Sequence, residues 1–524
     1  MRIGIDVGGT NTDAVLLAAD NNLLASVKTP TTPDVTGGVA WAVTDLLAAA
    51  AASGAIERID ELSAVMIGTT HFTNAIVERC GLTPTAVVRL ALPATGALPP
   101  LVGWPTALRE AVGGQSYLVH GGYEYDGSEL ATMDPDELRR VAVDIAERGV
   151  RSVAISSVFA PVNSEMELRA AEILRAEVPD LTISCSHEFG RIGLLERENA
   201  TVLNASLVDL AAKIVDALTE AVRGAGITAP LLLSQNDGTV MDVSYARRFP
   251  VATFASGPTN SMRGAAFLAG LTDCAVVDVG GTTADIGIVT GGLPREAGTF
   301  TELAGVRTNF RMPDLLSLGI GGGTLVRGSE FGPDSVGYEL TERALTFGGS
   351  ELTLSDLAVA AGMIELGDPD LVAQLDSNYV ASVLATVAER IADGVDRMRT
   401  SSQPLPVVVV GGGSMLVPEA LTGLDDIRRP AHYAVANAVG AAIAEVGGEV
   451  DRVVRMAADQ RDRVLAEVKQ EAMDRAARAG AREGTVRVVD VEEVPLAYLP
   501  GGATRVRVKA AGQLDVSRLA VVHA

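Results

Sequence analysis

The sequence contains very little cysteine. Its 524 residues include only Cys80, Cys185 and Cys274, which lie far apart and form no C-x-x-C pair. The spacing therefore indicates neither a disulfide framework nor a zinc knuckle. We expect three small, buried thiols in a protein of a reducing compartment.

Positive charge is also scarce, since 42 Lys and Arg stand against 66 Asp and Glu, a formal net charge of −24. Such a chain repels phosphate groups, so we expect neither nucleic acid nor an anionic membrane as a partner. No uncharged apolar run reaches the 18 residues of a membrane span, and the start, MRIGIDVGGT, lacks the apolar core of a signal peptide. These absences predict a cytoplasmic protein.

Aromatic residues make up only 4% of the chain, whereas hydrophobic residues as a whole make up 48%. The core must therefore consist mainly of Ala, Val, Leu and Ile, which suits helices packed closely on sheets. The length is enough for several domains with sizeable cores.

An internal repeat is the strongest organisational signal. Residues 6–13 read DVGGTNTD and residues 278–285 read DVGGTTAD. Each copy follows an apolar run and precedes another, which predicts a strand, a Gly-Gly turn and a second strand. The alternative is two unrelated hairpins that share a turn, but the Asp before and the Thr after each Gly-Gly pair argue against it.

The repeat predicts two similar domains of α/β type. We place the first over residues 1–188, the second over residues 189–450, and a small α+β appendage over residues 451–524. Alternating β and α patterns run from Asp134 to Ser184, and a long helix covers about Gly190–Arg223. In the last part we expect helices over Ser414–Leu421, Tyr433–Val446 and Asp451–Ala479.

The two hairpins are candidate phosphate-binding turns. Glycines without a Cβ let backbone N–H groups approach an anion, and the neighbouring hydroxyl and amide groups can add donors. The candidate residues are Gly8, Gly9, Thr10 and Asn11 in the first turn and Gly280, Gly281, Thr282 and Thr283 in the second. Asp6 and Asp278 are hard oxygen ligands suited to Mg²⁺, and two facing turns would clamp ATP. The alternative is that both aspartates only stabilise tight turns.

A third glycine-rich segment follows the strand at Val407–Val410. Gly411, Gly412 and Gly413 suit a nucleoside pocket in this position, although such a turn can also serve only close packing. The small residues of the helix expected over Tyr433–Val446 permit close contact with another helix at a hinge.

The order of these segments is typical of the actin-like ATPase superfamily. Within it, the chain resembles the hydantoinase/oxoprolinase family, as the A-type ATP-dependent subunit. The residues that carry the resemblance are Asp6–Asp13, Gly68–Glu78 (GTTHFTNAIVE), Glu196–Leu207 (ERENATVLNASL), Ser256–Pro258 (SGP), Asp278–Asp285 and Ser317–Thr324 (SLGIGGGT). The chain departs from the long members at Gly332–Tyr338 and at Leu233–Thr239, which leaves the substrate open.

The resemblance implies two ribonuclease-H-like domains around a nucleotide cleft and the ATP-dependent opening of a cyclic amide or ureide. It also implies a separately encoded companion subunit. Mg-ATP would phosphorylate the amide oxygen, and water would then open the ring. A small-molecule kinase and a chaperone-like reactivase ATPase remain alternatives, because similar hairpins occur in both.

Each of the other candidate residues has two possible roles. Thr69, Thr70 and Asn74 either line the substrate cleft or cap a helix. Glu198 either orients a nucleophile or is a solvated helix carboxylate, and Asp13 and Asp285 either hold the hairpins or reach metal-bound water. Gly321 and Gly322 either approach the nucleotide or form a structural loop. The five histidines show no metal-ligand spacing, so we assign none of them a role.

Overall fold

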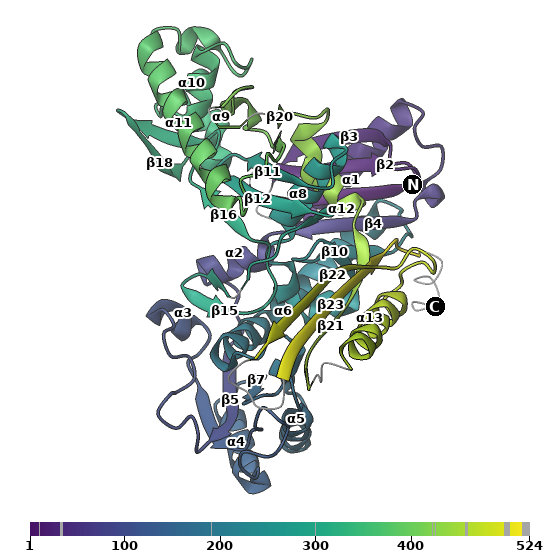
Figure 1. The fold of residues 1–524 in the computed structure, drawn as a ribbon. Coiled ribbons are helices and arrows are strands. Elements are labelled where there is room, and N and C mark those ends of the chain that lie inside the picture. The colour runs from purple at the N-terminus through teal and green to yellow at the C-terminus, as the bar shows by residue number, and fades with distance from the viewer. Residues whose placement is uncertain are drawn as a thin grey trace.

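The computed structural model describes residues 1–9, 11–31, 35–189, 191–298, 300–421, 423–424, 426–455, 460–496 and 503–515. Three sheets of four or more strands lie one after another along the molecule, with helices between and around them (Figure 1). The mixed α/β class predicted from the sequence is confirmed. Among the described residues, no helix is long and apolar enough to cross a membrane.

The largest sheet begins with the first predicted hairpin. The strand β1 (Arg2–Val7) pairs antiparallel with β2 (Asn11–Leu17), while β4 (Ala64–Thr69) runs parallel to β1 on its other side. The nine strands lie in the order β22 (Arg487–Pro495), β23 (Ala503–Gly512), β21 (Glu445–Arg455), β10 (Thr239–Asp242), β9 (Leu231–Ser234), β4, β1, β2 and β3 (Leu23–Pro30). The proposed domain boundaries at residues 188 and 450 therefore run through this sheet rather than between sheets.

The second sheet repeats the arrangement around the second hairpin. The strands β11 (Cys274–Val279) and β12 (Ala284–Thr290) pair antiparallel, and β19 (Val407–Val410) runs parallel to β11 as β4 does to β1. The short strands β13 (Leu293–Pro294), β16 (Leu315–Leu318) and β20 (Ile427–Arg428) complete this sheet, and α10 (Leu354–Ala360) and α11 (Ser377–Met398) lie beside it. Both predicted β-hairpins are thus confirmed.

The third sheet is parallel and lies at the far end of the molecule. Its strands are β6 (Ser116–His120), β5 (Thr85–Leu92), β7 (Ser152–Ser157) and β8 (Thr182–Cys185), with α4 (Pro135–Glu147) and α5 (Glu165–Glu177) connecting them. The predicted β/α alternation is confirmed here. The long helix α6 (Leu194–Gly224) packs on β7 and on α1 (Val35–Ala52), joining this sheet to the first.

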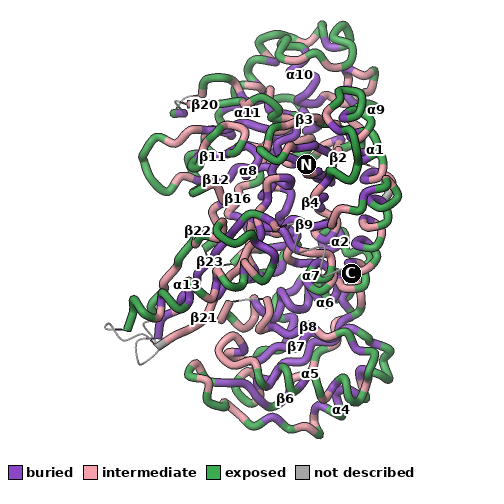
Figure 2. The backbone as a smooth tube through the Cα atoms, turned by 90° about the vertical axis from the view of Figure 1, so that its right-hand side faces the viewer, coloured by how far each residue is buried: buried purple, intermediate pink, exposed green. Residues whose placement is uncertain are grey.

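Two short-side-chain helices lie between the first two sheets. A Cβ on Gly264 of α8 (Ser256–Ala269) would lie 1.8 Å from the carbonyl oxygen of Ala436 in α12 (Ala436–Ala442), and a Cβ on Gly440 would lie 1.8 Å from that of Asn260. Only glycine permits these backbone contacts. The predicted close helix contact is confirmed. Most residues of both helices are buried, and α8 lies in the buried centre shown in Figure 2.

Near the end of the chain one predicted helix is absent, and the predicted bounds of two others are wrong. After Gly413 the chain forms only a 3-10 turn, Ser414–Leu416, because Pro418 cannot continue a helix and restricts the residue before it. The helix expected over Tyr433–Val446 ends at Ala442, and Glu445 begins β21. The helix expected from Asp451 begins at Arg461 as α13 (Arg461–Arg478), since the valines before it pair with β23 over ten residues.

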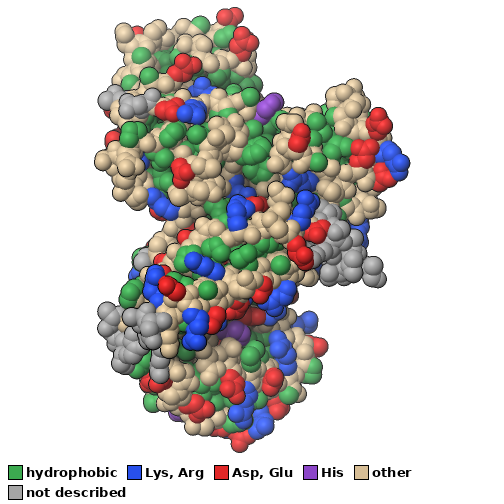
Figure 3. Space-filling model, turned by 45° about the vertical axis from the view of Figure 1, so that its right-hand side comes forward, with side chains coloured by type: hydrophobic (Ala, Val, Ile, Leu, Met, Phe, Trp, Pro, Cys, Tyr) green, Lys and Arg blue, Asp and Glu red, His purple; other side chains and the backbone are tan. Residues whose placement is uncertain are grey.

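Charged side chains are mixed by sign on the visible face of the molecule. Figure 3 shows Lys and Arg interspersed with Asp and Glu, and no large basic patch stands out on this face. On this face, therefore, the acidic residues are interspersed with basic ones rather than collected in one place.

Candidate functional site

Each hairpin carries two aspartates that face each other across its strands. In the first, Asp6 of β1 is paired in register with Asp13 of β2, and in the second, Asp278 is paired with Asp285. Directly opposed residues on one face of a sheet lie within contact distance of each other. The repeat therefore preserves a pair of carboxylates and not only a turn.

Helix α8 brings the two carboxylate pairs to one place. Asn260 donates from Nδ2 to Oδ1 of Asp6 at 3.4 Å, and the next residue, Ser261, donates from Oγ to Oδ2 of Asp278 at 2.5 Å. Asn437 of α12 donates to Asp6 at 3.1 Å and to Asp13 at 2.9 Å. The two hairpins thus converge on adjacent residues of one helix.

The electrostatics of this cluster favour a bound cation. Burial, assisted by the neighbouring Asp13, raises the pKa of Asp6 from 3.8 to about 6. Burial, with Asp285 and Asp6 nearby, raises the pKa of Asp278 to about 6 as well. Lys28 pairs with Asp13 at 2.6 Å, but no ion pair reaches Asp278 among the described residues. Carboxylates with too little positive charge around them fit a divalent cation, which would lower both pKa values.

The two turns close in the same way. The N–H of Gly8 donates to the carbonyl of Asn11 at 3.1 Å, and the N–H of Gly280 donates to that of Thr283 at 2.8 Å. Gly9, Thr282 and Thr283 are exposed at the tips, and Gly281 is partly exposed. Thr10 lies outside the described residues. The tips therefore have the exposure that a phosphate-binding turn requires.

The other predicted glycines mostly support the second turn. The N–H of Gly322 donates to the carbonyl of Gly280 at 3.0 Å, and a Cβ on Gly321 would lie 2.5 Å from the amide nitrogen of Thr282. The N–H groups of Gly411 and Gly413 donate to the carbonyls of Tyr433 and Val279. Gly412 faces open space, since nothing lies within 4 Å of its Cβ position. These contacts favour a shaping role for Gly321, Gly322, Gly411 and Gly413, with Gly412 accessible.

Two of the three predicted substrate residues lie beside Asp6. Thr69 ends β4 next to β1, is 1% exposed, and exchanges hydrogen bonds with Ser256 at the start of α8. Thr70 donates from Oγ1 to the carbonyl of Val7 at 3.4 Å and begins α2 (His71–Glu78) without a side-chain cap. Asn74 is exposed on α2, and no contact of its side chain joins it to these residues.

The structure does not place Glu198 among the aspartates. Arg89 donates to both of its carboxylate oxygens at 2.6 Å, and Ser156 donates to one of them at 2.6 Å. Arg89 is fully buried and Glu198 is 1% exposed, so the alternative of a solvated helix carboxylate is wrong. With both oxygens engaged in a buried pair, Glu198 has a structural setting rather than that of a catalytic acid.

Four residues at the site were not predicted from the sequence. Asn260 and Ser261 follow the SGP segment by two and three residues, so that segment was a usable signal for them. Lys28 and Asn437 carry no motif of their own. Their positions follow only from the pairing of β3 with β2 and from the packing of α12 on β1.

Comparison with known proteins identifies the family of the chain. The model for the hydantoinase/oxoprolinase N-terminal region matches residues 2–178, and the hydantoinase/oxoprolinase model matches residues 197–398. The chain is 28% identical over 394 residues to the caprolactamase subunit alpha of Pseudomonas jessenii, across 70% of this chain and 55% of that protein. It is 28% identical over 395 residues to the acetophenone carboxylase gamma subunit of Aromatoleum aromaticum, across 69% and 53%. The chain thus spans little more than half the length of these relatives.

Solved structures show the same fold. The crystal structure of the ATP-dependent caprolactamase from Pseudomonas jessenii superposes with a TM-score of 0.77 at 19% identity, covering 98% of this chain and 87% of that chain. The nucleotide-free structure of acetone carboxylase gives a TM-score of 0.70 at 17% identity, covering 98% and 88%. Identities this low establish the fold alone, and they agree with the fold class predicted from the sequence.

Proposed function

Because the chain belongs to the hydantoinase/oxoprolinase family, we propose that it binds Mg-ATP between its two hairpins and uses it to open a cyclic amide or ureide, such as a lactam, a hydantoin or 5-oxoproline. The observation that carries the proposal is the convergence of Asp6 and Asp278 on Asn260 and Ser261. The relatives named as ATP-dependent or as caprolactamase support the choice of substrate class.

Asp6 and Asp278 would hold the magnesium ion, and the ion would neutralise charge that develops on the transferred phosphoryl group. The exposed turn tips at Gly9 and Gly281–Thr283 would donate N–H groups to the phosphates. Thr69 and Thr70 lie at the carboxyl end of β4, beside Asp6, where they would border the acceptor. Asn260 and Asn437 keep the Asp6 carboxylate oriented toward this space.

Once the amide oxygen carries the phosphoryl group, water would add to the ring carbon and the C–N bond would break, with a proton going to the nitrogen. A second water would then attack the carbon of the resulting acyl phosphate and release inorganic phosphate together with the ring-opened acid. This order of events explains the use of ATP, because an amide is otherwise a poor electrophile. Positioning and electrostatic stabilisation by the two hairpins would provide most of the catalysis of the first step.

Relatives named as subunits support a separately encoded companion. We therefore propose that the chain acts in a heteromer. No nucleic acid and no membrane has a part in this proposal. We also propose a cytoplasmic location, which suits three unpaired cysteines; Cys185 and Cys274 are buried as expected, whereas Cys80 is exposed.

ATP-dependent carboxylation of a ketone is the second candidate, since a carboxylase subunit matches the chain with the same 28% identity. Product analysis separates the two candidates. With each cyclic amide, ADP formation and ring-opened acid should rise together. With a ketone and bicarbonate, only the carboxylase would form a keto acid.

The test compares wild-type protein with Asp278→Asn, in the presence and absence of the protein encoded beside it. Asp393→Asn is the matched control, because Asp393 is an exposed aspartate on α11 in the same part of the molecule. We expect amide-stimulated ADP formation in the wild type and the control but not in Asp278→Asn. Equal activity in all three would overturn the site.

A further inference from the structure

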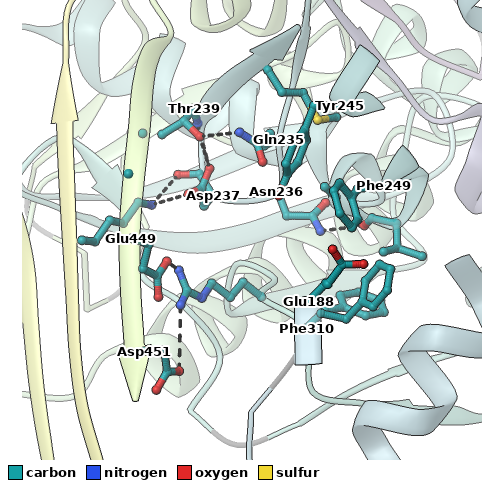
Figure 4. A pocket seen from close by; sticks show the side chains of 18 of the residues that line it. Glu188, Gln235, Asn236, Asp237, Thr239, Tyr245, Phe249, Phe310, Glu449 and Asp451 are labelled. Atoms are coloured by element: carbon teal, nitrogen blue, oxygen red, sulfur yellow. Dashed lines mark hydrogen bonds and ion pairs between the residues drawn. The ribbon is translucent and has the colours of Figure 1, made fainter. Parts of the chain in front are cut away.

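A cavity of about 530 Å³ lies away from the two hairpins. Its walls come from the β9–β10 loop, α7 (Val243–Arg248) and the segment after it, the 3-10 helix η2 (Ser186–Glu188), and parts of β21, β23 and α13. Figure 4 shows the interior of this cavity, whose volume suits a small organic ligand. Because Asp6, Thr69 and Thr70 do not line it, a ligand bound here is not the phosphoryl acceptor.

One wall of the cavity follows the end of a parallel strand. The strands β5, β7 and β8 of the third sheet run parallel, and η2 begins directly after β8. In open α/β sheets, ligands bind beyond the carboxyl ends of the strands. His187, Glu188 and Arg191 line the cavity from this segment, and the buried Glu167 lies 2.7 Å from Nδ1 of His187 and fixes its ring.

Most charged side chains of the wall already have partners. The contacts are those of Glu188 with Arg248, Asp237 with Lys509, Arg311 with Glu449 and Asp451, Arg475 with Glu471, and Asp242 with backbone N–H groups at the start of α7. Figure 4 shows those of Asp237, Glu449 and Asp451. In the described part of the chain, Arg191 is the one arginine or lysine of this wall without an ion pair.

The guanidinium group of Arg191 has one free edge. Its Nη1 atom donates to the carbonyl of Gly298 at 3.0 Å, whereas Nε is buried without a hydrogen-bond partner, and no contact of Nη2 is present among the described residues. The Nε and Nη2 atoms of an arginine bind a carboxylate through two parallel hydrogen bonds. Burial, with Arg505 and Arg507 nearby, lowers the pKa of Arg191, and a bound anion would oppose this change. One unpaired positive charge matches one negative charge, which favours a carboxylate over a doubly charged phosphate.

Hydrogen-bond acceptors without partners lie on the same wall. Asn309 donates from Nδ2 to the backbone carbonyl of Arg191 at 3.2 Å, so these two residues are neighbours. The Oδ1 atom of Asn309 has no partner, although this residue is only 4% exposed. Glu188 is engaged by Arg248 through Oε1, which leaves its other carboxylate oxygen as an acceptor. An N–H group of a ligand would satisfy these acceptors.

The remaining surface of the cavity is largely apolar. Although aromatic residues are rare in this chain, Phe189, Tyr245, Phe249 and Phe310 all line it, and Figure 4 shows the last three on one side. Aromatic faces of this kind pack against the carbon chain of a ligand. The cavity therefore suits a molecule with a carboxylate, an N–H group and an apolar part.

We propose that this cavity binds the ring-opened product, an amino acid or carbamoyl amino acid, with its carboxylate on the free edge of Arg191 and its nitrogen toward Asn309 and Glu188. The inference rests on the proposed function for its choice of ligand. Opening a lactam or a hydantoin yields one carboxylate and one nitrogen that bears N–H groups, joined by carbon. The unopened ring of either compound lacks the carboxylate, so Arg191 distinguishes the product from the substrate.

The test measures binding of three probes, ε-aminocaproate, γ-aminobutyrate and hydantoate, to the full chain by calorimetry, with the carboxamide of each as its uncharged match. Arg191→Gln removes the guanidinium group, Arg191→Lys keeps the charge without the paired donors, and Ala252→Leu narrows the cavity independently. The control is Arg151→Gln, because Arg151 is exposed, lies outside the cavity and has no ion pair among the described residues either.

We expect the preferred acid to bind at least about tenfold more tightly than its carboxamide, the effect of one charge-assisted hydrogen bond. Arg191→Gln should remove this preference, Arg191→Lys should keep part of it, and Ala252→Leu should weaken binding of the acid. Arg151→Gln should bind like the wild type. The matching cyclic amide at saturation should not displace the acid, because the acceptor site beside Asp6 is separate.

Binding of the acid that stays unchanged in either cavity variant, equal binding of acid and carboxamide, displacement by the cyclic amide, or no binding of any acid would overturn the assignment. Failure of the proposed function has a different signature. Acid binding that depends on Arg191, in a protein that opens no cyclic amide with ATP, would contradict the proposed function and leave a carboxylate site in place.

Discussion

Replacing Asp6 by Asn separates the effect of this buried carboxylate on folding stability from its role in ATP turnover. Asp6 is 4% exposed, and its pKa is raised from 3.8 to about 6, which corresponds to about 3 kcal/mol of destabilisation when the group is ionised in the ligand-free protein. The pKa of Asp6 is higher in the folded state than in the unfolded state, so the protonated carboxyl favours folding. This contribution to stability is fully present below pH 3.8 and is lost as the pH rises through about 6. At pH 8, Asp6→Asn should therefore be more stable than the wild type, by at most about 3 kcal/mol.

The surroundings can accept the amide. Asn260 donates to Asp6 through Nδ2 at 3.4 Å, while its own Oδ1 atom has no partner. If the Asn260 amide turns over, that oxygen can accept a hydrogen bond from the new side chain, so we expect no new unsatisfied group. The stabilising effect should survive in the folded variant.

The assay is unfolding at pH 5 and pH 8, with and without Mg-ATP, together with ATPase activity. Wild-type protein should gain stability with Mg-ATP at pH 8, whereas Asp6→Asn should gain little and turn over no ATP. A variant that is less stable than the wild type at pH 8, or one that keeps wild-type activity, would refute this reasoning about Asp6.

Four further results are expected. Glu198→Gln should lower the free energy of unfolding by about 3–5 kcal/mol because it leaves Arg89 buried without its charge partner. Glu220→Gln, on the exposed side of the same helix, should change it little. Equal stability of the two variants would contradict the structural role of Glu198. Gly440→Ala should destabilise the protein, since its Cβ would lie 1.8 Å from the carbonyl of Asn260, while Gly224→Ala, which faces open space, is the control for an added methyl group. Purified chain alone should open the amide slowly and gain rate with its companion, and full activity without one would exclude an obligatory heteromer. Substrate labelled with ¹⁸O at the amide should transfer the label to inorganic phosphate, and label kept wholly in the ring-opened acid would contradict phosphorylation of the amide oxygen.

Much of the fold could be predicted because its signals are local. Alternating apolar residues and paired glycines define the hairpins at Asp6–Asp13 and Asp278–Asp285, and β1, β2, β11 and β12 follow them closely. The region after Gly413 could not be read in this way. Its charged residues suggested one long helix, but the valines of β21 pair with β23, a strand about fifty residues further along the chain. Such long-range pairing leaves no periodicity that distinguishes it in advance.

The same distinction between local signals and long-range contacts applies to the candidate site. Residues inside motifs, such as Asp6, Asp278 and Thr69, could be selected from the sequence, because the glycines and hydroxyls around them imply anion chemistry. Glu198 also lay inside a motif, but the partner that decides its role, Arg89, is 109 residues away. His187 was likewise assigned no role, because its partner, Glu167, contacts it only in the folded chain. A motif identifies the residue types at a site, whereas the contacts that assign their roles come from distant segments.

The two hairpins are similar in sequence but not in electrostatic setting, and the difference bears on how a cation would be held. On the first hairpin, Lys28 pairs with Asp13, and two amides donate to Asp6. On the second, Asp278 and Asp285 each receive a single hydroxyl, from Ser261 and Ser317. The pKa of Asp278 is nevertheless raised as far as that of Asp6, to about 6. Since the protein itself supplies a cation only to the first pair, a bound divalent ion should compensate the second pair more, and Asp278→Asn should weaken the magnesium dependence of ATP binding more than Asp6→Asn does.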